Sequence, residues 1–483
     1  MYTFKRWALS LSVFLSGMTG AQQSIQVANY PAMYENQASH TEATPEKILS
    51  PKEFFELNVT KLASDPVLRN ARWGYIIYDP KTKRTISSYN EKEAFIPAST
   101  TKLLTTETAL ALLGSKFHWV TQLEYSGEID EFGVLNGNLY IIGSGDPSLG
   151  TGKAGSARYS EIVADYISAI REKGIKKVTG DIFLHTAVFK ENASISLPPN
   201  IVWEPKNNYY LPVGTTKDID PRSEQLIVKK KAPGLGAKEY FYISPYINKL
   251  VYTDKFENTH LTTRLPDAPS YLGNTLRTTL AKSGIPVTGK VIARSTESIP
   301  EKTFLLKAYR SPNLIDIISD TNHRSDNALA EATLRMLGFQ KMGDQTSESG
   351  RAVVVQHLKE MGIEDEGFNF ADGSGLSRSN TISPLAHAKF LTSVMGTKYY
   401  KEFFDSLPTA GQSGTLKSSF KGNAYGMLNA KTGTLSKVKT LAGYLKTRSG
   451  KTYVFSLLIN NYGGSVSQVK HKMEQLLDPA IDL

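Results

Sequence analysis

The stretch FIPASTTKLLTTETALALLG, residues 95–114, is the starting point for interpreting the whole chain. Pro97 interrupts the preceding segment, and apolar residues then recur at helical spacing as far as Gly114. This pattern predicts a buried helix that begins near Ser99. Residues three apart lie on the same face of a helix, so we expect the Ser99 hydroxyl and the Lys102 amine to project together from its first turn.

Two further motifs follow in a fixed order. S-D-N and K-T-G-T each occur once, at Ser325, Asp326 and Asn327 and at Lys431, Thr432, Gly433 and Thr434. Taken separately, each motif has a purely structural interpretation, because the serines could be helix caps and K-T-G could be a turn. Serine three before lysine also recurs elsewhere, at Ser418, Ser436 and Ser467. The ordered set, placed on a helix start, a helix junction and a strand, favours one shared active site.

The trio is the signature of serine β-lactamases and penicillin-binding proteins, and the chain resembles that superfamily. The long interval between Ser99 and Ser325 is similar to the class C low-molecular-mass penicillin-binding proteins, the D-alanyl-D-alanine carboxypeptidase and endopeptidase family of penicillin-binding protein 4. That family carries a large insert between its first two motifs. GSGDPSLG, VTGDIFLH and ADGSGLSRSN also resemble segments of the family.

The chemistry requires an activated serine. A serine hydroxyl is a weak nucleophile until a base takes its proton, and Lys102 can do so only when it is neutral. We therefore expect burial and the charge of Lys431 to lower the pKa of Lys102. Ser325 could relay the proton to the leaving amine, and Asn327 could hold the substrate backbone or orient Lys102. Which group acts as the base stays open.

The K-T-G-T segment is expected on an edge strand beside the serine, as the substrate-binding strand. The charge of Lys431 and the hydroxyls of Thr432 and Thr434 suit a terminal carboxylate, and Gly433 lets a ligand approach the backbone. The resemblance implies an oxyanion hole made of the backbone N–H groups of Ser99 and Thr434.

Local patterns predict an α+β fold. Residues 73–78 and 85–89 form one hairpin signal, and two strand-like runs around residues 448–450 form another. Helical segments lie between them in sequence, which indicates an antiparallel sheet flanked by helices. The resemblance implies a DD-peptidase or β-lactamase-like transpeptidase fold with a large β-rich insert.

The domain organisation follows from the same patterns. Residues 1–21 have a basic start, an apolar run and a small residue at Ala21, which predicts a secretory signal peptide and export to the periplasm or extracytoplasmic envelope. Residues 22–50 are expected to be a flexible leader. The catalytic domain is expected over residues 51–118 and 266–483. The intervening residues 119–265 are expected to be a β-rich insert of one or two subdomains.

Composition excludes several kinds of chemistry. The chain has no cysteine, and its eight histidines include no H-E-x-x-H, so neither a thiolate nor a zinc site is expected, and no cofactor is implied. GTGKAG, residues 150–155, matches a dinucleotide fingerprint but lacks its strand-to-helix frame, which indicates a flexible loop. His323 precedes Ser325 closely, but no G-x-S-x-G supports a hydrolase triad.

We therefore expect an exported serine-type D-Ala-D-Ala carboxypeptidase that acts on peptidoglycan stem peptides through an acyl-enzyme on Ser99. Action on cross-links as a DD-endopeptidase would be an extension of the same chemistry. β-Lactams are expected as covalent inhibitors, with no nucleic acid partner and at most peripheral membrane contact. One alternative is a serine β-lactamase, although no E-x-x-L-N is found. Another is a non-catalytic cell-wall binding or sensing protein.

Overall fold

The computed structural model describes residues 49–186, 268–295, 299–300, 302–363 and 366–483, and the backbone of six short strands between residues 201 and 252. The expected signal peptide, residues 1–21, lies outside the described residues. So does nearly all of the expected leader, residues 22–50. Among the described residues, no helix is long and apolar enough to cross a membrane.

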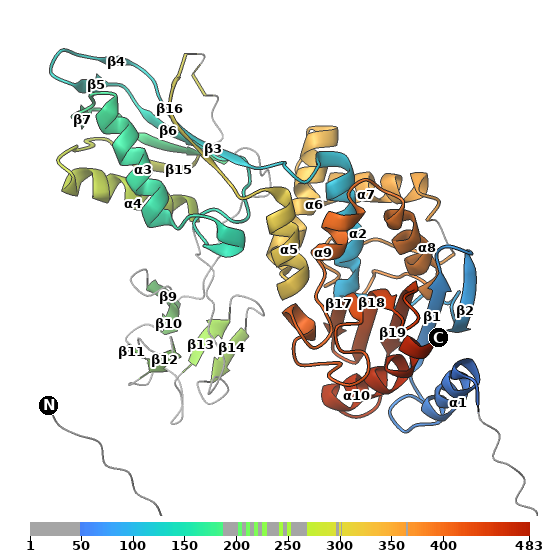
Figure 1. The fold of residues 1–483 in the computed structure, drawn as a ribbon. Helices are drawn as coiled ribbons and strands as arrows, with labels where there is room; N and C mark the ends of the chain where they lie inside the picture. The colour runs from blue at the N-terminus through green and yellow to red at the C-terminus, as the bar shows by residue number, and fades with distance from the viewer. Residues whose placement is uncertain are drawn as a thin grey trace, which may run out of the picture. The chain divides into compact units, whose positions relative to one another are not determined.

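A five-stranded antiparallel sheet has the strand order β17-β18-β19-β1-β2 (Figure 1). Its strands are β1 (Arg72–Asp79), β2 (Arg84–Tyr89), β17 (Leu428–Leu435), β18 (Val438–Lys446) and β19 (Thr452–Asn460). Both predicted hairpins are confirmed, and they share this sheet because β1 pairs with β19. The K-T-G-T segment lies on β17, at one edge of the sheet.

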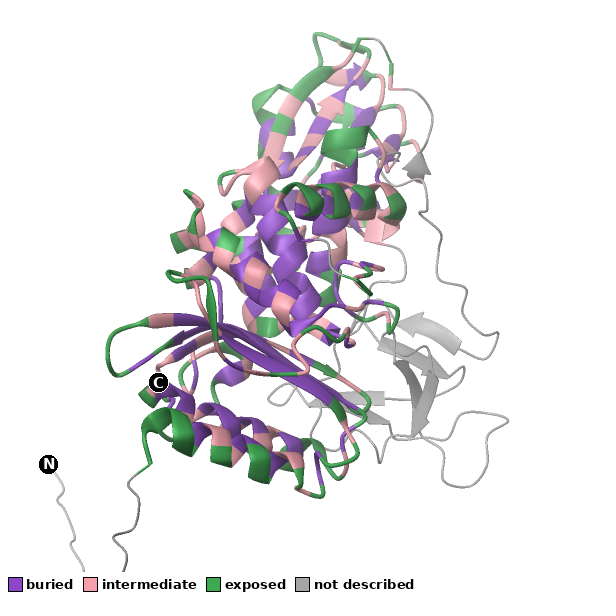
Figure 2. Cartoon of the chain, turned by 90° about the vertical axis from the view of Figure 1, so that its right-hand side faces the viewer, coloured by how far each residue is buried: buried purple, intermediate pink, exposed green. Residues whose placement is uncertain are grey.

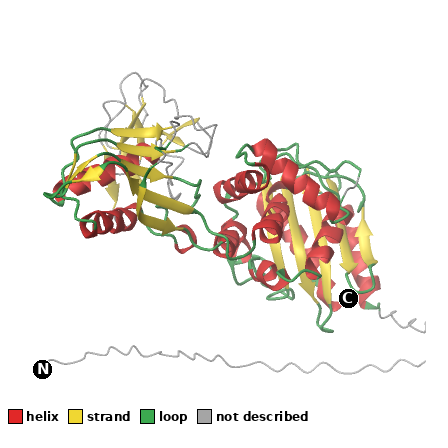
Figure 3. Ribbon diagram, turned by 90° about the horizontal axis from the view of Figure 1, so that it is seen from above, coloured by secondary structure: helices red, strands yellow, loops and turns green. Residues whose placement is uncertain are grey.

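Helices cover both faces of this sheet, which confirms the α+β fold (Figure 3). The helices of this part of the chain are α1 (Pro51–Ala63), α2 (Lys102–Leu113), α5 (Leu314–Arg324), α6 (Asn327–Met342), α7 (Ser347–Glu360), α8 (Pro384–Met395), α9 (Tyr400–Asp405) and α10 (Val466–Leu477). Alternate strand residues enter different cores: Ile76 and Leu458 pack with α2, α6 and α8, whereas Tyr75 packs with α1 and α10. Since both faces are covered, the central strands β1 and β19 carry successive buried apolar residues instead of an alternating pattern, and Figure 2 shows the middle of the sheet buried.

The predicted helix after Pro97 begins later than its sequence indicates. A 3₁₀ turn, η1 (Ala98–Thr101), comes first, and the α-helix α2 begins at Lys102. The turn is tight because Thr100 donates to the Pro97 carbonyl from both its N–H and its hydroxyl, at 3.3 and 2.8 Å. The predicted end is confirmed, with Gly114 as C-cap at φ +82°.

A second five-stranded sheet has the order β15-β8-β6-β3-β16. Its strands are β3 (Val120–Tyr125), β6 (Leu139–Ile142), β8 (Ile182–His185), β15 (Val291–Ser295) and β16 (Phe304–Arg310). Its helices α3 (Tyr159–Glu172) and α4 (Ala268–Lys282) enclose a core of its own, which includes Tyr166 and Leu276. The expected insert boundary at residue 265 falls inside this unit, because β16 pairs with β3 and so extends the unit to Arg310.

The remaining strands form small sheets. β4 (Glu128–Ile129), β5 (Val134–Asn136) and β7 (Lys177–Val178) form a three-stranded sheet. Three two-stranded antiparallel sheets pair β9 (Ile201–Glu204) with β10 (Tyr209–Pro212), β11 (Lys217–Asp220) with β12 (Gln225–Val228), and β13 (Phe241–Ser244) with β14 (Lys249–Tyr252).

Candidate active site

The Lys102 ammonium lies at the centre of the site and is completely buried. Its Nζ donates to Ser99 Oγ at 3.1 Å, to Asn327 Oδ1 at 2.6 Å and to the carbonyl oxygen of Ser374 at 2.6 Å. The turn η1 thus holds Ser99 within hydrogen-bonding distance of Lys102, as the spacing predicts. Ser99 Oγ thus accepts its hydrogen bond from Lys102 and not from His323.

The S-D-N motif forms the junction between α5 and α6. Ser325 ends α5 in the left-handed region at φ +58°, and Asp326 is the N-cap of α6, accepting from Leu329 N at 3.1 Å. A non-glycine residue at positive φ is uncommon and strained, so the surrounding contacts must hold Ser325 there. The turn places Ser325 beside Lys431 and Asn327 beside Lys102.

Lys431 on β17 connects the third motif to the second. Its fully buried Nζ donates to Ser325 Oγ at 2.8 Å and to the carbonyl of Thr432 at 2.8 Å. The structure therefore brings residues of all three motifs together, although they are separated by hundreds of positions in the chain. These bonds use two of the three N–H donors of the Lys431 ammonium. The role expected for its charge, binding of a terminal carboxylate, stays a prediction.

Gly433 allows β17 to lie directly against η1. A Cβ atom at this position would stand 2.9 Å from Ser99 N, 2.7 Å from the Pro97 carbonyl oxygen and 2.1 Å from Thr440 Oγ1. The first two are backbone atoms that cannot move aside independently. Close packing of the K-T-G-T strand on η1 therefore requires glycine here.

Burial sets the protonation of both central lysines. It lowers the pKa of Lys102 to about 8, while Glu331, Asp372 and Asp326 act in the opposite direction. The expected fall in the pKa of Lys102 is present, and burial causes it; the contribution expected from the Lys431 charge stays a prediction. Burial also lowers the pKa of Lys431 well below its usual value, assisted by the charges of Lys102 and Lys439. Two ammonium groups in such a site disfavour each other's charge.

The loop that follows α7 supplies a residue that the sequence interpretation missed. Ser374, in the segment ADGSGLSRSN, accepts from Lys102 through its carbonyl and donates from its N–H to Glu331 Oε1 at 2.8 Å. Asp372 shapes the loop by accepting from Gly375 N and Ser377 N, both at 2.6 Å. Glu331 lies one helical turn after Asn327 on α6, and this spacing is the sequence feature that could have predicted its position near the site.

The two threonines of K-T-G-T also have side-chain partners. Thr432 Oγ1 donates to Thr415 Oγ1 at 2.8 Å, and Lys439 Nζ donates to Thr434 Oγ1 at 2.5 Å. Lys439 is directly opposite Thr434 in the β17–β18 register and is only 9% exposed. Burial, assisted by Lys470, lowers the pKa of Lys439 to about 8. The oxyanion hole of Ser99 and Thr434 N–H groups stays a prediction.

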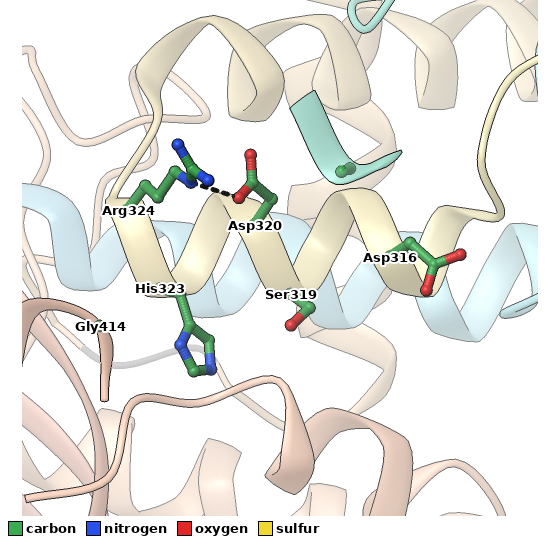
Figure 4. A pocket seen from close by; sticks show the side chains of 7 residues that line it. Asp316, Ser319, Asp320, His323, Arg324 and Gly414 are labelled. Atoms are coloured by element: carbon green, nitrogen blue, oxygen red, sulfur yellow. Dashed lines mark ion pairs between the residues drawn. The ribbon is translucent and has the colours of Figure 1, made fainter. Parts of the chain in front are cut away.

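A cavity of about 510 Å³ adjoins the S-D-N turn (Figure 4). Its lining residues are Ala154, Asp316, Ser319, Asp320, His323, Arg324 and Gly414. Burial lowers the pKa of His323, Lys431 adds to this effect, and Asp320 opposes it. Arg324 Nε pairs with Asp320 Oδ1 at 2.6 Å. Among the described residues, no cluster of three or more histidine, cysteine, aspartate or glutamate side chains could hold a metal ion.

Comparison with known proteins identifies the family. The model of the D-Ala-D-Ala carboxypeptidase 3 (S13) family matches residues 55–248 and 252–479. The D-alanyl-D-alanine carboxypeptidase DacB of Haemophilus influenzae is 25% identical, over 88% of this chain and 92% of its own. The D-alanyl-D-alanine carboxypeptidase of Actinomadura sp. strain R39 is 26% identical, over 84% of this chain and 81% of its own.

Solved structures show the same fold. The crystal structure of penicillin-binding protein 4 (dacB) from Haemophilus influenzae has a TM-score of 0.64 and 23% identity, and covers 88% of this chain and 98% of its own. The same protein complexed with a β-lactam has a TM-score of 0.66, with 24% identity and the same coverage.

The chain belongs to the D-Ala-D-Ala carboxypeptidase 3 (S13) family. It is therefore a serine-type D-Ala-D-Ala carboxypeptidase within the superfamily of serine β-lactamases and penicillin-binding proteins, related to the class C penicillin-binding proteins. The family decides against the β-lactamase and non-catalytic alternatives.

Proposed function

We propose that this enzyme cleaves D-Ala-D-Ala stem peptides through an acyl-enzyme on Ser99, with Lys102 as the base. The observation that carries the proposal is the set of three partners around Lys102 Nζ. The carbonyl of Ser374 and the side-chain oxygen of Asn327 can only accept, whereas the Ser99 hydroxyl can donate. When Lys102 is neutral, its two protons satisfy the acceptors and its lone pair faces Ser99.

In this mechanism Lys102 takes the Ser99 proton as Oγ attacks the carbonyl carbon of the penultimate D-alanine. The tetrahedral intermediate then collapses, its carbon–nitrogen bond breaks, and the terminal D-alanine leaves with a proton on its amine. Ser325 relays to that amine the proton that Lys102 took from Ser99: its hydroxyl gives one proton to the amine and regains one from Lys102. Lys431, which donates to Ser325 Oγ, holds the hydroxyl in place for the transfer. Water subsequently hydrolyses the acyl-enzyme and regenerates Ser99.

The terminal carboxylate is held by the hydroxyls of Thr432 and Thr434, with Lys439 as the accompanying charge. Lys431 is fully buried and donates to Ser325 and to a carbonyl, which leaves its third N–H donor and its charge to attract the carboxylate. Lys439 donates directly to the Thr434 hydroxyl. A hydrogen bond reinforced by a cation is about twice as strong as a neutral one.

The same nucleophile accounts for acylation by β-lactams and for DD-endopeptidase action on cross-links, both of which we include in the proposal. Support comes from the relative in Haemophilus influenzae whose solved structure holds a β-lactam. We also propose an extracytoplasmic location, the periplasm or cell envelope, because the first 21 residues have the pattern of a secretory signal and the substrate is a cell-wall peptide.

The test combines labelling with product analysis. Intact-protein mass spectrometry after incubation with penicillin should show one long-lived adduct that maps to Ser99, and Ser99→Ala should show none while keeping its thermal stability. Purified pentapeptide muropeptides should lose one alanine, and cross-linked dimers should be cleaved into monomers. An adduct that persists in Ser99→Ala would overturn the assignment of the nucleophile.

A further inference from the structure

The GTGKAG segment, residues 150–155, is the one motif that the proposed function leaves without a role. It lies in the part of the chain between β6 and α3, and its centre is the 3₁₀ turn η2 (Lys153–Gly155). Lys153 Nζ forms an ion pair and hydrogen bond with Asp326 Oδ2, in the middle of the S-D-N motif. The Asp326 side chain is 15% exposed and that of Lys153 is 37% exposed.

The loop that carries Lys153 has a defined hydrogen-bond network, although its composition indicates a flexible loop. Thr151 Oγ1 and Ser156 Oγ both donate to the carbonyl of Ser148, at 2.6 and 2.7 Å, and Lys153 N donates to Thr151 Oγ1 at 3.0 Å. Ser148 is itself held by Asp146, which accepts from its N–H and its hydroxyl. These bonds fix the backbone from which Lys153 extends.

Asp326 connects this loop to the reacting atoms in two ways. Its second oxygen, Oδ1, caps α6 at Leu329 N, and the next residue, Asn327, holds the Lys102 amine at 2.6 Å. Its negative charge also favours the protonated form of Lys102, which cannot act as a base. A cation bound to Asp326 offsets that charge while leaving the cap in place.

The charged groups around Lys102 come from several elements. They are Asp326 and Glu331 at the start of α6, Asp372 in the loop after α7, Lys431 on β17 with Lys439 beside it on β18, and Lys153 on η2. Three carboxylates thus favour a charged Lys102. Burial raises the pKa of Asp326, but the bond from Lys153 and the helix N–H groups outweigh it, so Asp326 is ionised and paired.

We propose that Lys153 is a positioning residue of the acylation reaction: it neutralises Asp326 and fixes the S-D-N turn, so that Asn327 holds an uncharged Lys102 amine against Ser99. The proposal rests on the proposed function of Ser99 and Lys102. It assigns to the segment between the first two motifs a direct part in setting the protonation of the base, beyond its expected roles as an insert.

Charge-altering variants test the proposal through the pH profile of acylation. For the wild-type enzyme, the rate of acylation by a fluorescent penicillin should rise with pH through about 8, because the Lys102 amine must lose its proton. Lys153→Met leaves the Asp326 charge unopposed, so the midpoint should move up by about 0.5–1 pH unit and the rate at pH 7 should fall about three- to tenfold. Lys153→Arg, which keeps the charge, should retain the wild-type midpoint.

Removing the charge of Asp326 should shift the midpoint of the pH profile in the opposite direction. Asp326→Asn keeps a residue that caps helices well but leaves the Lys153 charge unopposed, so the midpoint should move down. The double variant Lys153→Met/Asp326→Asn removes both charges and should return the midpoint close to that of the wild type. Lys177→Met removes an exposed lysine from the same part of the chain and should change nothing.

Thermal unfolding of every variant shows whether it is folded. If Lys153→Met lowers the acylation rate equally at every pH and leaves the midpoint unchanged, the proposal is overturned. Such a result would mean that Lys153 stabilises the structure without affecting the protonation of Lys102. A double variant shifted as far as Lys153→Met would also overturn it. If Lys153→Met does not fold, Asp326→Asn still decides, because an unchanged midpoint there contradicts the coupling. Labelling of Ser99→Ala would refute the proposed function separately, whatever the Lys153 variants do.

Discussion

The hydroxyl of Thr434 on β17 has an unusual partner, the nearly buried ammonium of Lys439. A charge held in this way costs desolvation, and the pKa of Lys439 is lowered to about 8 mainly by burial. An anionic ligand beside Thr434 would compensate for that cost. We therefore predict that Lys439 selects substrates with a free terminal carboxylate.

We predict that Lys439→Met lowers the acylation rate constant for a peptide substrate with a free D-Ala carboxylate by about tenfold, because a charge-assisted contact is lost. The matching substrate with a terminal amide should be affected much less. Steady-state kinetics on both substrates provide the measurement. Lys437→Met is the control, since Lys437 Nζ donates instead to the carbonyl of Gly464. Equal losses on both substrates would contradict the selective role.

At the scale of elements, the site depends on how closely β17 approaches η1. The strand and the turn are in contact with no room for a side chain at Gly433, where a Cβ would meet two backbone atoms of the turn. Hairpin geometry places β17, and the threonine hydrogen bonds to Pro97 and Ala98 hold the turn. The position of Ser99 therefore depends on both β17 and η1.

Gly433→Ala should push β17 away from η1 and misplace Ser99 relative to Lys102. We expect penicillin acylation to slow by at least about tenfold, since a displacement of about 1 Å can cost a hundredfold in rate. Overpacking should also cost about 1–3 kcal/mol of stability. Stopped-flow acylation and urea unfolding measure the two effects. Unchanged acylation in a folded Gly433→Ala enzyme would show that the spacing is not critical.

The contact of α8 with β19 carries a pH-sensitive group. His387 on α8 is fully buried, and its Nδ1 lies 3.1 Å from Ser456 Oγ on β19. Burial lowers the pKa of His387 to about 3 in the folded protein, against an ordinary value of 6.5. The unfolded state binds the proton more readily, so stability decreases as pH falls below 6.5.

At pH 5 this single histidine should cost the folded enzyme about 2 kcal/mol relative to pH 7.5, at about 1.36 kcal/mol for each pH unit below the unfolded pKa. His387→Gln cannot titrate, so its free energy of unfolding should change less between the two pH values by that amount. Urea unfolding of both proteins at pH 5 and 7.5 measures the difference. If the free energy of unfolding of His387→Gln depends on pH as that of the wild type does, groups other than His387 cause the pH dependence.

At the scale of the whole molecule, the described residues form three separate hydrophobic cores. Two lie on opposite faces of the sheet that contains β17, and the third belongs to the sheet that contains β3. Leu276 on α4 lies in the third core and Leu458 on β19 in the first, and both are fully buried. A destabilising substitution in one core should therefore mainly lower the stability of the helices and strands that pack around that core.

We predict that Leu276→Ala and Leu458→Ala each cost about 2–5 kcal/mol, but in different parts of the molecule. Leu458→Ala should lower the calorimetric transition that covalently bound penicillin raises. Leu276→Ala should lower a transition that is insensitive to penicillin. If both variants lower the penicillin-sensitive transition equally, the two sheets unfold as one cooperative unit.

The sequence alone determined the local and ordered features of this protein. Helical periodicity ending at Gly114, turn residues between strands and three motifs in fixed order identify the α+β fold and the family, because such signals lie within a few neighbouring residues. Tertiary structure alone decided the start of α2 at Lys102, the extension of the second sheet to Arg310, and the contacts that Ser374, Lys439 and Lys153 make. Each of these features depends on atoms that packing brings together from distant positions in the chain. A local sequence pattern does not indicate which distant residue will be the hydrogen-bond partner of a given group.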